Sequence, residues 1–100
     1  MSAQREAWIW AGVLLGEITS ILHPKGVRVS MQYDRSANAV KVMAFCLIQS
    51  RPYDYEASFS FRELAFTSNG EVSYMAKVFA ENYLHGLRKE VASERERVTI

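Results

Sequence analysis

Hydrophobic residues near the N-terminus recur at intervals of three and four positions, the spacing that places side chains on one face of a helix. The residues of this series are Trp8, Ala11, Leu15, Ile18 and Leu22. Further apolar residues widen the face beyond half of the helix circumference: Trp10, Val13, Leu14 and Ile21. Pro24 and Gly26 predict the end of this helix, because proline disfavours helical geometry in the residue before it and glycine supports a turn.

Three segments with the alternation of β-strands follow the first helix. Residues 27–34 alternate apolar and polar side chains and predict a half-buried strand. Residues 39–49 are apolar in both phases and rich in β-branched and aromatic side chains, and residues 35–38 supply the turn before them. Pro52 breaks that run at the start of a third strand, where proline is tolerated. The third segment alternates strictly, with its apolar side chains at Tyr53, Tyr55, Ala57, Phe59 and Phe61.

The last part of the chain carries the pattern of a long helix. Ser68 and Glu71 have the spacing of a capping box, in which each side chain satisfies a free backbone N–H group at the helix start. Residues 93–100 begin with alternating acidic and basic side chains and predict a charged C-terminal tail. The apolar residues at helical spacing between these two segments are Val72, Met75, Ala76, Phe79, Ala80, Tyr83, Leu84, Leu87 and Val91.

These elements predict an α+β fold in a single domain, residues 1–92, in the order helix, three strands, helix (α-β-β-β-α). Short connections make the strands antiparallel neighbours in sequence order. Both helices are expected on one face of the three-stranded antiparallel sheet, because each helix must bury its apolar side against another element.

The middle strand has two apolar faces, and only one of them can pack under the helices. We expect the smaller side chains of this strand to face inward, since they let the helices approach the sheet closely. Met43, Phe45 and Leu47 then form an exposed apolar stripe, the kind of patch that marks an interaction site. The alternatives are that one helix crosses to this face or that the tail folds back over it. We take these three residues as partner-binding, with Arg28 and Lys41 as their polar rim.

The first helix raises a second question about exposed surface. Gly12, Gly16 and Ser20 lie four residues apart and form a row along which another backbone can approach. We interpret this row as tight packing of the helix on the sheet rather than as pairing of two helices. Trp8 and Trp10 point in directions about 200° apart on a helix, so both cannot enter one core. One of them is expected near a partner or under the long C-terminal helix, and both are candidate partner-binding residues.

The overall charge hides two segments of opposite sign. The 100 residues are 49% hydrophobic and 23% charged with a net charge of +1, which excludes a disordered chain, a polybasic tail and an acidic mimic of DNA. Residues 25–51 hold five basic residues and one acidic residue, a net of +4. Residues 52–87 hold two basic and five acidic residues, a net of −3. The first hairpin is therefore expected to form a basic edge beside an acidic strand and helix.

Helix, three strands and helix is also the element order of double-stranded RNA-binding domains, and the topology of this chain is similar to theirs. The resemblance implies nucleic-acid binding through phosphate contacts as an alternative function. Those domains place a lysine cluster at the start of the last helix, where this chain keeps Ala76 and Lys77 but also has Glu71. Their first hairpin loop carries Gly-Pro and a histidine, and residues 35–38 have neither. The candidate residues for this alternative are Lys25, Arg28, Arg35, Lys41, Arg51 and Lys77.

The ionisable residues form no recognisable catalytic or metal-binding motif. His23, His85 and Cys46 do not assemble a zinc site, and the apolar run around the cysteine predicts a small buried thiol. Asp54 and Glu56 share a strand face about 7 Å apart, and we interpret them as solvated carboxylates. The sequence has no phosphate-binding glycine loop and no nucleophile elbow. We expect no catalytic residue, no metal and no cofactor.

The sequence therefore predicts a small non-catalytic protein-binding module, a regulator, inhibitor or assembly factor of bacterial or phage type, which acts as a homodimer or on another protein. A three-stranded sheet leaves two open edges, and such units commonly dimerise. The alternatives are the nucleic-acid-binding domain and an enzyme of unknown chemistry. Residues 7–15 have the apolar run of a signal peptide after Arg5, but Glu6 and Glu17 flank it. We expect a cytoplasmic protein with no membrane segment.

Overall fold

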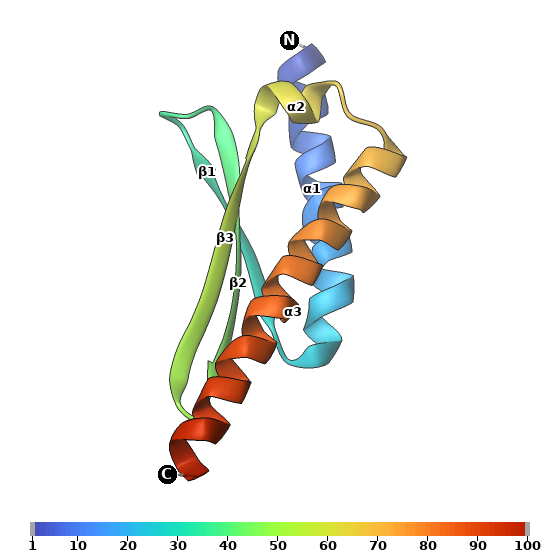
Figure 1. Ribbon diagram of the computed structural model, residues 1–100. Helices are drawn as coiled ribbons and strands as arrows, with labels where there is room; N and C mark the ends of the chain where they lie inside the picture. Colours follow the sequence, from blue (N-terminus) through green and yellow to red (C-terminus); the bar gives the residue numbers. More distant parts are fainter. Residues whose placement is uncertain (1, 100) are drawn as a thin grey trace.

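The chain forms two layers, a three-stranded antiparallel sheet and two long helices that pack on one face of it (Figure 1). The structure is a computed structural model that describes the backbone of residues 2–99 and the side chains of residues 3–93 and 95. The predicted α-β-β-β-α order is confirmed, with one additional short helix. The elements are α1 (Ser2–Leu22), the 3₁₀ turn η1 (His23–Lys25), β1 (Arg28–Asp34), β2 (Ala39–Ile48), β3 (Arg51–Ser60), α2 (Phe61–Ala65) and α3 (Asn69–Thr99).

The strands lie in the order β1-β2-β3, so β2 is the central strand and β1 and β3 are the edges. The register places Phe45 of β2 between Arg28 of β1 and Asp54 of β3, and Met43 in the next row of the same face. The β2–β3 turn consists of Gln49 and Ser50, and both have positive φ, 50° and 68°. That is the geometry of a two-residue type I′ hairpin. The central strand therefore ends at this turn, and Arg51 and Pro52 already belong to β3.

The core lies between the sheet and the helices. Val40, Val42 and Ala44 of β2 are buried, so the smaller side chains face inward as their size predicts. The buried residues of α1 recur every three or four positions and give this helix one core-facing side: Ala7, Ala11, Leu14, Ile18 and Leu22. The buried residues of α3 do the same: Val72, Ala76, Phe79, Ala80 and Tyr83.

The sequence did not predict α2, and its assignment of Phe61 to the third strand is wrong. The strand ends at Ser60, whose hydroxyl accepts a hydrogen bond from the Glu63 backbone N–H at 3.1 Å and caps α2. Phe61 and Leu64 of this short helix are both buried. The interval from Ser60 to Glu63 is the same capping spacing that predicts the start of the last helix, and it could have revealed this one.

One half of the predicted capping box of the last helix is present, while the Glu71 side chain accepts from a hydroxyl rather than from the backbone N–H of Ser68. The Ser68 hydroxyl accepts a hydrogen bond from the Glu71 backbone N–H at 3.4 Å, while the Glu71 carboxylate accepts one from the Thr67 hydroxyl at 3.3 Å. The helical backbone of α3 continues to Thr99, beyond the predicted domain boundary at residue 92. The tail side chains at 94 and 96–100 lie outside the described residues, and the tail boundary stays a prediction.

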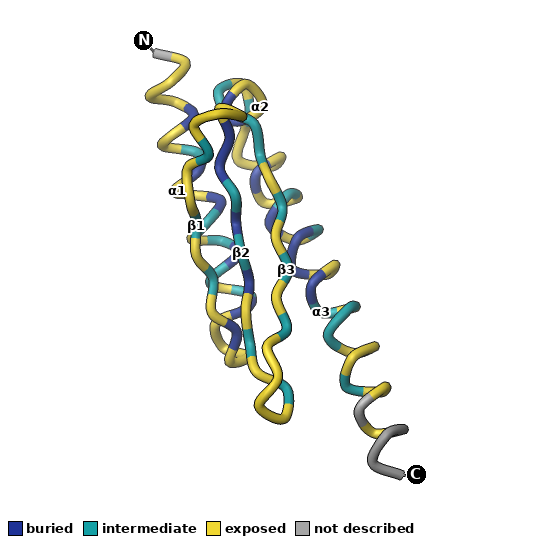
Figure 2. The backbone as a smooth tube through the Cα atoms, turned by 90° about the vertical axis from the view of Figure 1, so that its left-hand side faces the viewer, coloured by how far each residue is buried: buried dark blue, intermediate teal, exposed yellow. Residues whose placement is uncertain are grey.

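The molecule is long and thin. Its Cα atoms extend over 58 × 28 × 16 Å with a radius of gyration of 15.4 Å, whereas a compact chain of this length has about 13 Å. Figure 2 looks onto the sheet from the side away from the helices. In the part of the chain that the structure describes, both long helices lie behind the sheet, so neither crosses to this outer face.

Candidate protein-binding surfaces

The sheet presents one uncovered face, which we call the outer sheet face. Phe45 and Leu47 of β2 are exposed there, by 38% and 63%, and Met43 beside them is half-buried. Exposure of this size is unusual for a phenylalanine and a leucine that lie next to each other on one strand face. The predicted stripe therefore lies on the surface. The register places the following residues on this face: Arg28, Ser30, Gln32, Lys41, Met43, Phe45, Leu47, Asp54, Glu56 and Ser58.

Charge on the outer sheet face changes sign across the strands. Arg28 on β1 and Asp54 on β3 lie on opposite sides of Phe45 in one row. Two inter-strand spacings separate their backbones, about 10 Å, so the apolar side chain lies between the opposite charges. In the next row Glu56 of β3 lies beside Met43. The apolar stripe is thus one side chain wide, with a basic flank and an acidic flank.

Lys41 lies on the same face near the β1–β2 turn. The turn is organised by Asp34, whose carboxylate accepts hydrogen bonds from the Ser36 hydroxyl at 2.8 Å and from the Ser36 and Ala37 backbone N–H groups. These hydrogen bonds, the Ser36 hydroxyl first, lower the pKa of Asp34, and the positive charge of Lys41 lowers it further. Lys41 thus contributes to the electrostatic environment of this turn.

The second apolar surface is the side of α1 that faces away from the sheet, which we call the α1 outer face. It exposes Trp8, Ile9 and Val13, and Ile9 is 50% exposed. A Cβ atom added at Gly12 or Gly16 would meet no other atom within 4 Å. The expectation that these glycines pack the helix tightly on the sheet is therefore wrong, because they lie on the exposed side of α1.

The two tryptophans take different environments. The Trp8 ring packs edge-on against Phe61, with ring centroids 4.9 Å apart, and lies 5.4 Å from the Tyr33 ring. Trp8 therefore covers one end of the core while its other side remains exposed. Trp10 is half-buried and packs against the core. The sequence left open which tryptophan is the more buried, and the structure identifies Trp10.

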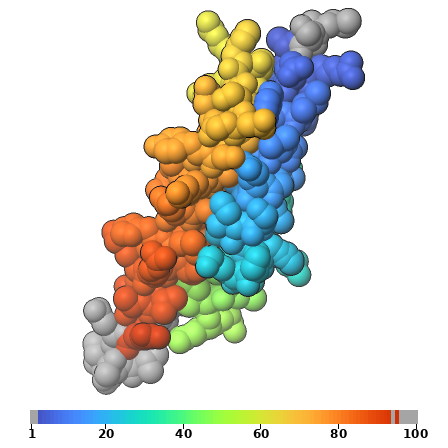
Figure 3. Space-filling model, turned by 90° about the vertical axis from the view of Figure 1, so that its right-hand side faces the viewer, coloured from blue at the N-terminus to red at the C-terminus, as the bar shows by residue number. Residues whose placement is uncertain are grey.

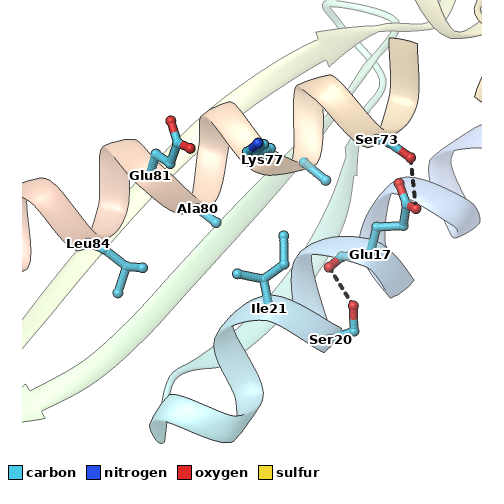
Figure 4. Close-up of a pocket in the computed structure, with 9 residues that line it drawn as sticks. Glu17, Ser20, Ile21, Ser73, Lys77, Ala80, Glu81 and Leu84 are labelled. Carbon is cyan, nitrogen blue, oxygen red and sulfur yellow. Dashed lines mark hydrogen bonds between the residues drawn. The ribbon is translucent and has the colours of Figure 1, made fainter. Parts of the chain in front are cut away.

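A cleft of about 440 Å³ runs between α1 and α3, which lie side by side on the face shown in Figure 3. In the close-up of Figure 4, Ile21 of α1 points toward α3, and Ala80 and Leu84 of α3 point toward α1. Glu17 lies at one end of this cleft, where its carboxylate oxygen Oε1 accepts a hydrogen bond from the Ser73 hydroxyl at 3.0 Å. Its Oε2 is buried and has no hydrogen-bond partner among the side chains and backbone that the structure describes. The cleft is therefore mainly an apolar groove, with Glu17, Glu81 and Lys77 as its charged lining residues.

A hollow of about 680 Å³ opens where β2 extends past the start of β1. Cys46 lines it and is half-buried rather than fully buried as predicted, because β1 does not reach its position. The Tyr83 hydroxyl donates to the Cys46 Sγ at 3.0 Å and to the Tyr53 carbonyl oxygen at 3.3 Å. Burial, and then the hydrogen bond to Cys46, raises the pKa of Tyr83 well above its ordinary value.

The residues of the nucleic-acid alternative do not share one surface. Lys25 and Arg28 line the hollow at the end of the sheet, and Arg51 lies next to the β2–β3 turn at the same end. Arg35 is in the β1–β2 turn at the other end of β1, and Lys77 lies on α3 beside the interhelical cleft. Lys41 is on the outer sheet face between these ends. The structure therefore brings together only the cations at one end of the sheet.

Comparison with protein-family models, curated proteins and solved structures finds no match. The choice among functions therefore depends on the side chains that the fold exposes.

The two histidines lie apart from each other on different elements. His23 in η1 and His85 on α3 are exposed. Asp54 and Glu56 are exposed on the outer sheet face. Among the described residues, no group of three or more histidine, cysteine, aspartate or glutamate side chains is placed to hold a metal ion. None of the helices in the described part of the chain has the length and apolar character needed to cross a bilayer.

Three exposed hydrophobic residues escaped the sequence analysis. Phe66, between α2 and α3, is 79% exposed, Tyr74 on α3 is 69% exposed, and Ile9 lies on the α1 outer face. Ile9 and Tyr74 fall outside the helical series that predict the buried faces. A large apolar residue outside such a series is the signal that could have identified both.

Proposed function

We propose that the chain is a non-catalytic module that binds a protein through its outer sheet face. The observation that carries this proposal is the exposure of Phe45 and Leu47 on a sheet face that no described helix covers. Burial of a phenylalanine or leucine side chain contributes about 1.5–3 kcal/mol relative to full exposure. Phe45 and Leu47 retain 38% and 63% of their exposure, so a partner that covers them adds the corresponding part of this stabilisation.

The charges on both sides of the apolar stripe favour a protein as the partner over a molecule that has no charged groups. An interface between proteins has an apolar centre and a polar rim, and the rim charges determine orientation more than affinity. Met43, Phe45 and Leu47 provide the centre, with Arg28 and Lys41 on the rim as the sequence predicts. Asp54 and Glu56 extend that rim along β3 with the opposite charge.

The wider role that fits this surface is that of a small regulator, inhibitor or assembly factor. The sequence contains one cysteine and no pair that could form an intramolecular disulfide. Such cysteine usage fits a reducing compartment such as the cytoplasm.

The test is the substitution Phe45→Asp. Because this side chain lies on the outer sheet face and is 38% exposed, the variant should keep its circular dichroism spectrum and lose about 1–2 kcal/mol of stability with the apolar area that Phe45 already buries. Light-scattering mass and capture of proteins from a lysate of the source cells should both show that association is lost. Ser58→Asp is the matched control, because it adds the same carboxylate to the same face outside the apolar stripe, and it should retain association.

Two results would contradict the proposal. If Phe45→Asp unfolds the protein, the side chain belongs to the core and the stripe is not a binding surface. If the variant folds and associates as the wild type does, the partner binds elsewhere. Ile9→Asp on the α1 outer face then identifies whether that surface is used instead.

A further inference from the structure

We infer that the partner of the outer sheet face is a second copy of this chain, related to the first by a two-fold axis that runs along β2. This inference rests on the proposed function of the face and identifies its occupant. It is carried by the register of the three strands, which arranges apolar, basic and acidic side chains in a self-complementary pattern.

The register makes the charges complementary under this axis. Arg28, Phe45 and Asp54 form one row across β1, β2 and β3. A two-fold axis along β2 places β1 of one copy opposite β3 of the other. It does not change the position of any row along the strand direction. Arg28 of one copy then lies opposite the partner's Asp54, and Asp54 lies opposite the partner's Arg28, so the contact forms twice.

The same operation brings apolar side chains together. Residues of β2 lie on the axis, so Phe45 meets the partner's Phe45, and Met43 and Leu47 meet their own counterparts. In the row of Met43, Glu56 of β3 lies opposite the partner's Ser30, whose hydroxyl can donate to the carboxylate. The stripe that is exposed in a single chain becomes the centre of an interface with ion pairs on both sides.

The dimensions agree with face-to-face packing of two sheets. Such sheets lie about 10 Å apart with their mean strand directions within about 30° of each other, and an axis along β2 makes the two β2 strands parallel. An arginine and an aspartate side chain together span that gap. Strands of seven, ten and ten residues, at about 3.3 Å per residue and about 4.8 Å spacing, give a footprint of roughly 430 Å² per copy. This area is at the lower limit for a specific interface, so the dimer should be reversible, with a dissociation constant on the order of micromolar or weaker.

One contact limits the affinity of this dimer. Lys41 also belongs to β2 and lies near the partner's Lys41 across the axis. This repulsion between like charges weakens the dimer, and the two Arg28–Asp54 contacts remain the determinants of register.

A two-fold axis across the strands would make a different dimer. It would place β1 opposite the partner's β1 and β3 opposite the partner's β3, so Arg28 would not face the partner's Asp54 at any position of the axis. An interface through the α1 outer face would involve neither Arg28 nor Asp54. These arrangements are distinguished from the proposed one by the effect of substitutions at Asp54.

The experiment uses two charge reversals, Arg28→Asp and Asp54→Arg, measured by sedimentation equilibrium over a range of concentrations. Each single variant places like charges opposite each other twice, so each should dissociate at least about tenfold more readily than the wild type. A mixture of the two variants should form a heterodimer of near wild-type affinity, because aspartate at 28 then faces arginine at 54. In the mixture the two altered residues belong to different chains. Recovered affinity therefore reports a contact between chains and not a contact within one chain.

Circular dichroism and thermal melting establish that each variant is folded before its mass is measured. If aspartate at strand position 28 prevents folding, Arg28→Glu with Asp54→Lys repeats the design with side chains of higher strand propensity. Self-association of the wild type, weakening in each single variant and recovery in the mixture support the inference.

Several outcomes would overturn it. A wild type that stays monomeric at several hundred micromolar excludes the second copy as occupant, while the Phe45→Asp capture experiment still decides whether the face binds another protein. Single variants that dimerise as the wild type does place the dimer on another surface. A mixture that fails to recover excludes an axis along β2, even if Phe45→Asp abolishes the dimer.

Discussion

Gly86 on α3 and the two glycines on the exposed side of α1 are helical glycines in opposite surroundings. A Cβ atom at Gly86 would collide with the Tyr53 hydroxyl of β3, and the Tyr53 ring is itself packed on Tyr83 at a centroid distance of 5.1 Å. The lack of a side chain at 86 therefore lets α3 lie close to the sheet. At Gly12 and Gly16 the fold itself makes no such demand.

This contrast predicts opposite effects for the same substitution. Gly86→Ala should lower the free energy of unfolding by about 1–3 kcal/mol, because the added methyl group forces the Tyr53 ring from its site. Gly12→Ala should raise it by about 0.5–1 kcal/mol, because alanine loses less conformational entropy than glycine in a helix. Urea denaturation followed by circular dichroism measures both. A stabilised Gly86→Ala would mean that Tyr53 moves aside without cost.

The short helix α2 shows how far the sequence determines an element. Alternation continues without interruption from Tyr53 to Phe61, so the pattern alone extends the third strand into Phe61. The structure ends the strand one residue earlier, because Ser60 caps a helix that buries Phe61 and Leu64 against the end of the core. At this point strand alternation favours a longer β3, while the Ser60–Glu63 capping spacing favours a helix. The capping hydrogen bond and the burial of Phe61 and Leu64 favour the helix.

The free energy of unfolding should fall at alkaline pH because Tyr83, which packs α3 against the sheet, loses its proton there. This tyrosine has its pKa raised above the ordinary value near 10, first by burial and then by its hydrogen bond to Cys46. A raised pKa means that the folded state holds the proton more tightly than the unfolded state. The contribution to stability is therefore complete below about pH 10 and falls as the pH rises toward the pKa of the folded state.

Tyr83→Phe tests this dependence. The variant should lose about 0.5–1.5 kcal/mol at neutral pH with the hydrogen bonds of the hydroxyl. Between pH 10 and 12, its unfolding free energy should fall less steeply than that of the wild type. Tyr74→Phe is the control, since that tyrosine is 69% exposed, and it should leave the pH profile unchanged. Equal slopes in wild type and Tyr83→Phe would show that Tyr83 does not titrate with unfolding.

At the scale of the molecule, the sequence predicts the layers and the apolar stripe but not the arrangement of charge around it. Periodicity is local, so it identifies which residues of β2 share a face. The row that contains Arg28, Phe45 and Asp54 depends on the register of both hairpins, and a slip of one residue in either would move a charge to the other face. The turns that fix the register carry no Asn-Gly or Asp-Gly signal, so only the structure reveals the opposite charges on either side of the stripe.

The shape of the monomer gives a last prediction for the proposed dimer. The strands run lengthwise in a molecule whose largest Cα extent is 58 Å and whose smallest is 16 Å (Figure 2). Because a two-fold axis along β2 stacks the sheets face to face, the second copy adds to the thickness and hardly to the length. Small-angle X-ray scattering at concentrations that favour the dimer should therefore show a doubled mass with a maximum dimension close to that of the monomer. Phe45→Asp, measured at the same concentration, supplies the monomer curve. A maximum dimension approaching twice that of the monomer would mean that the copies meet end to end, through the β2–β3 turn or α3, and would exclude the sheet face as their contact.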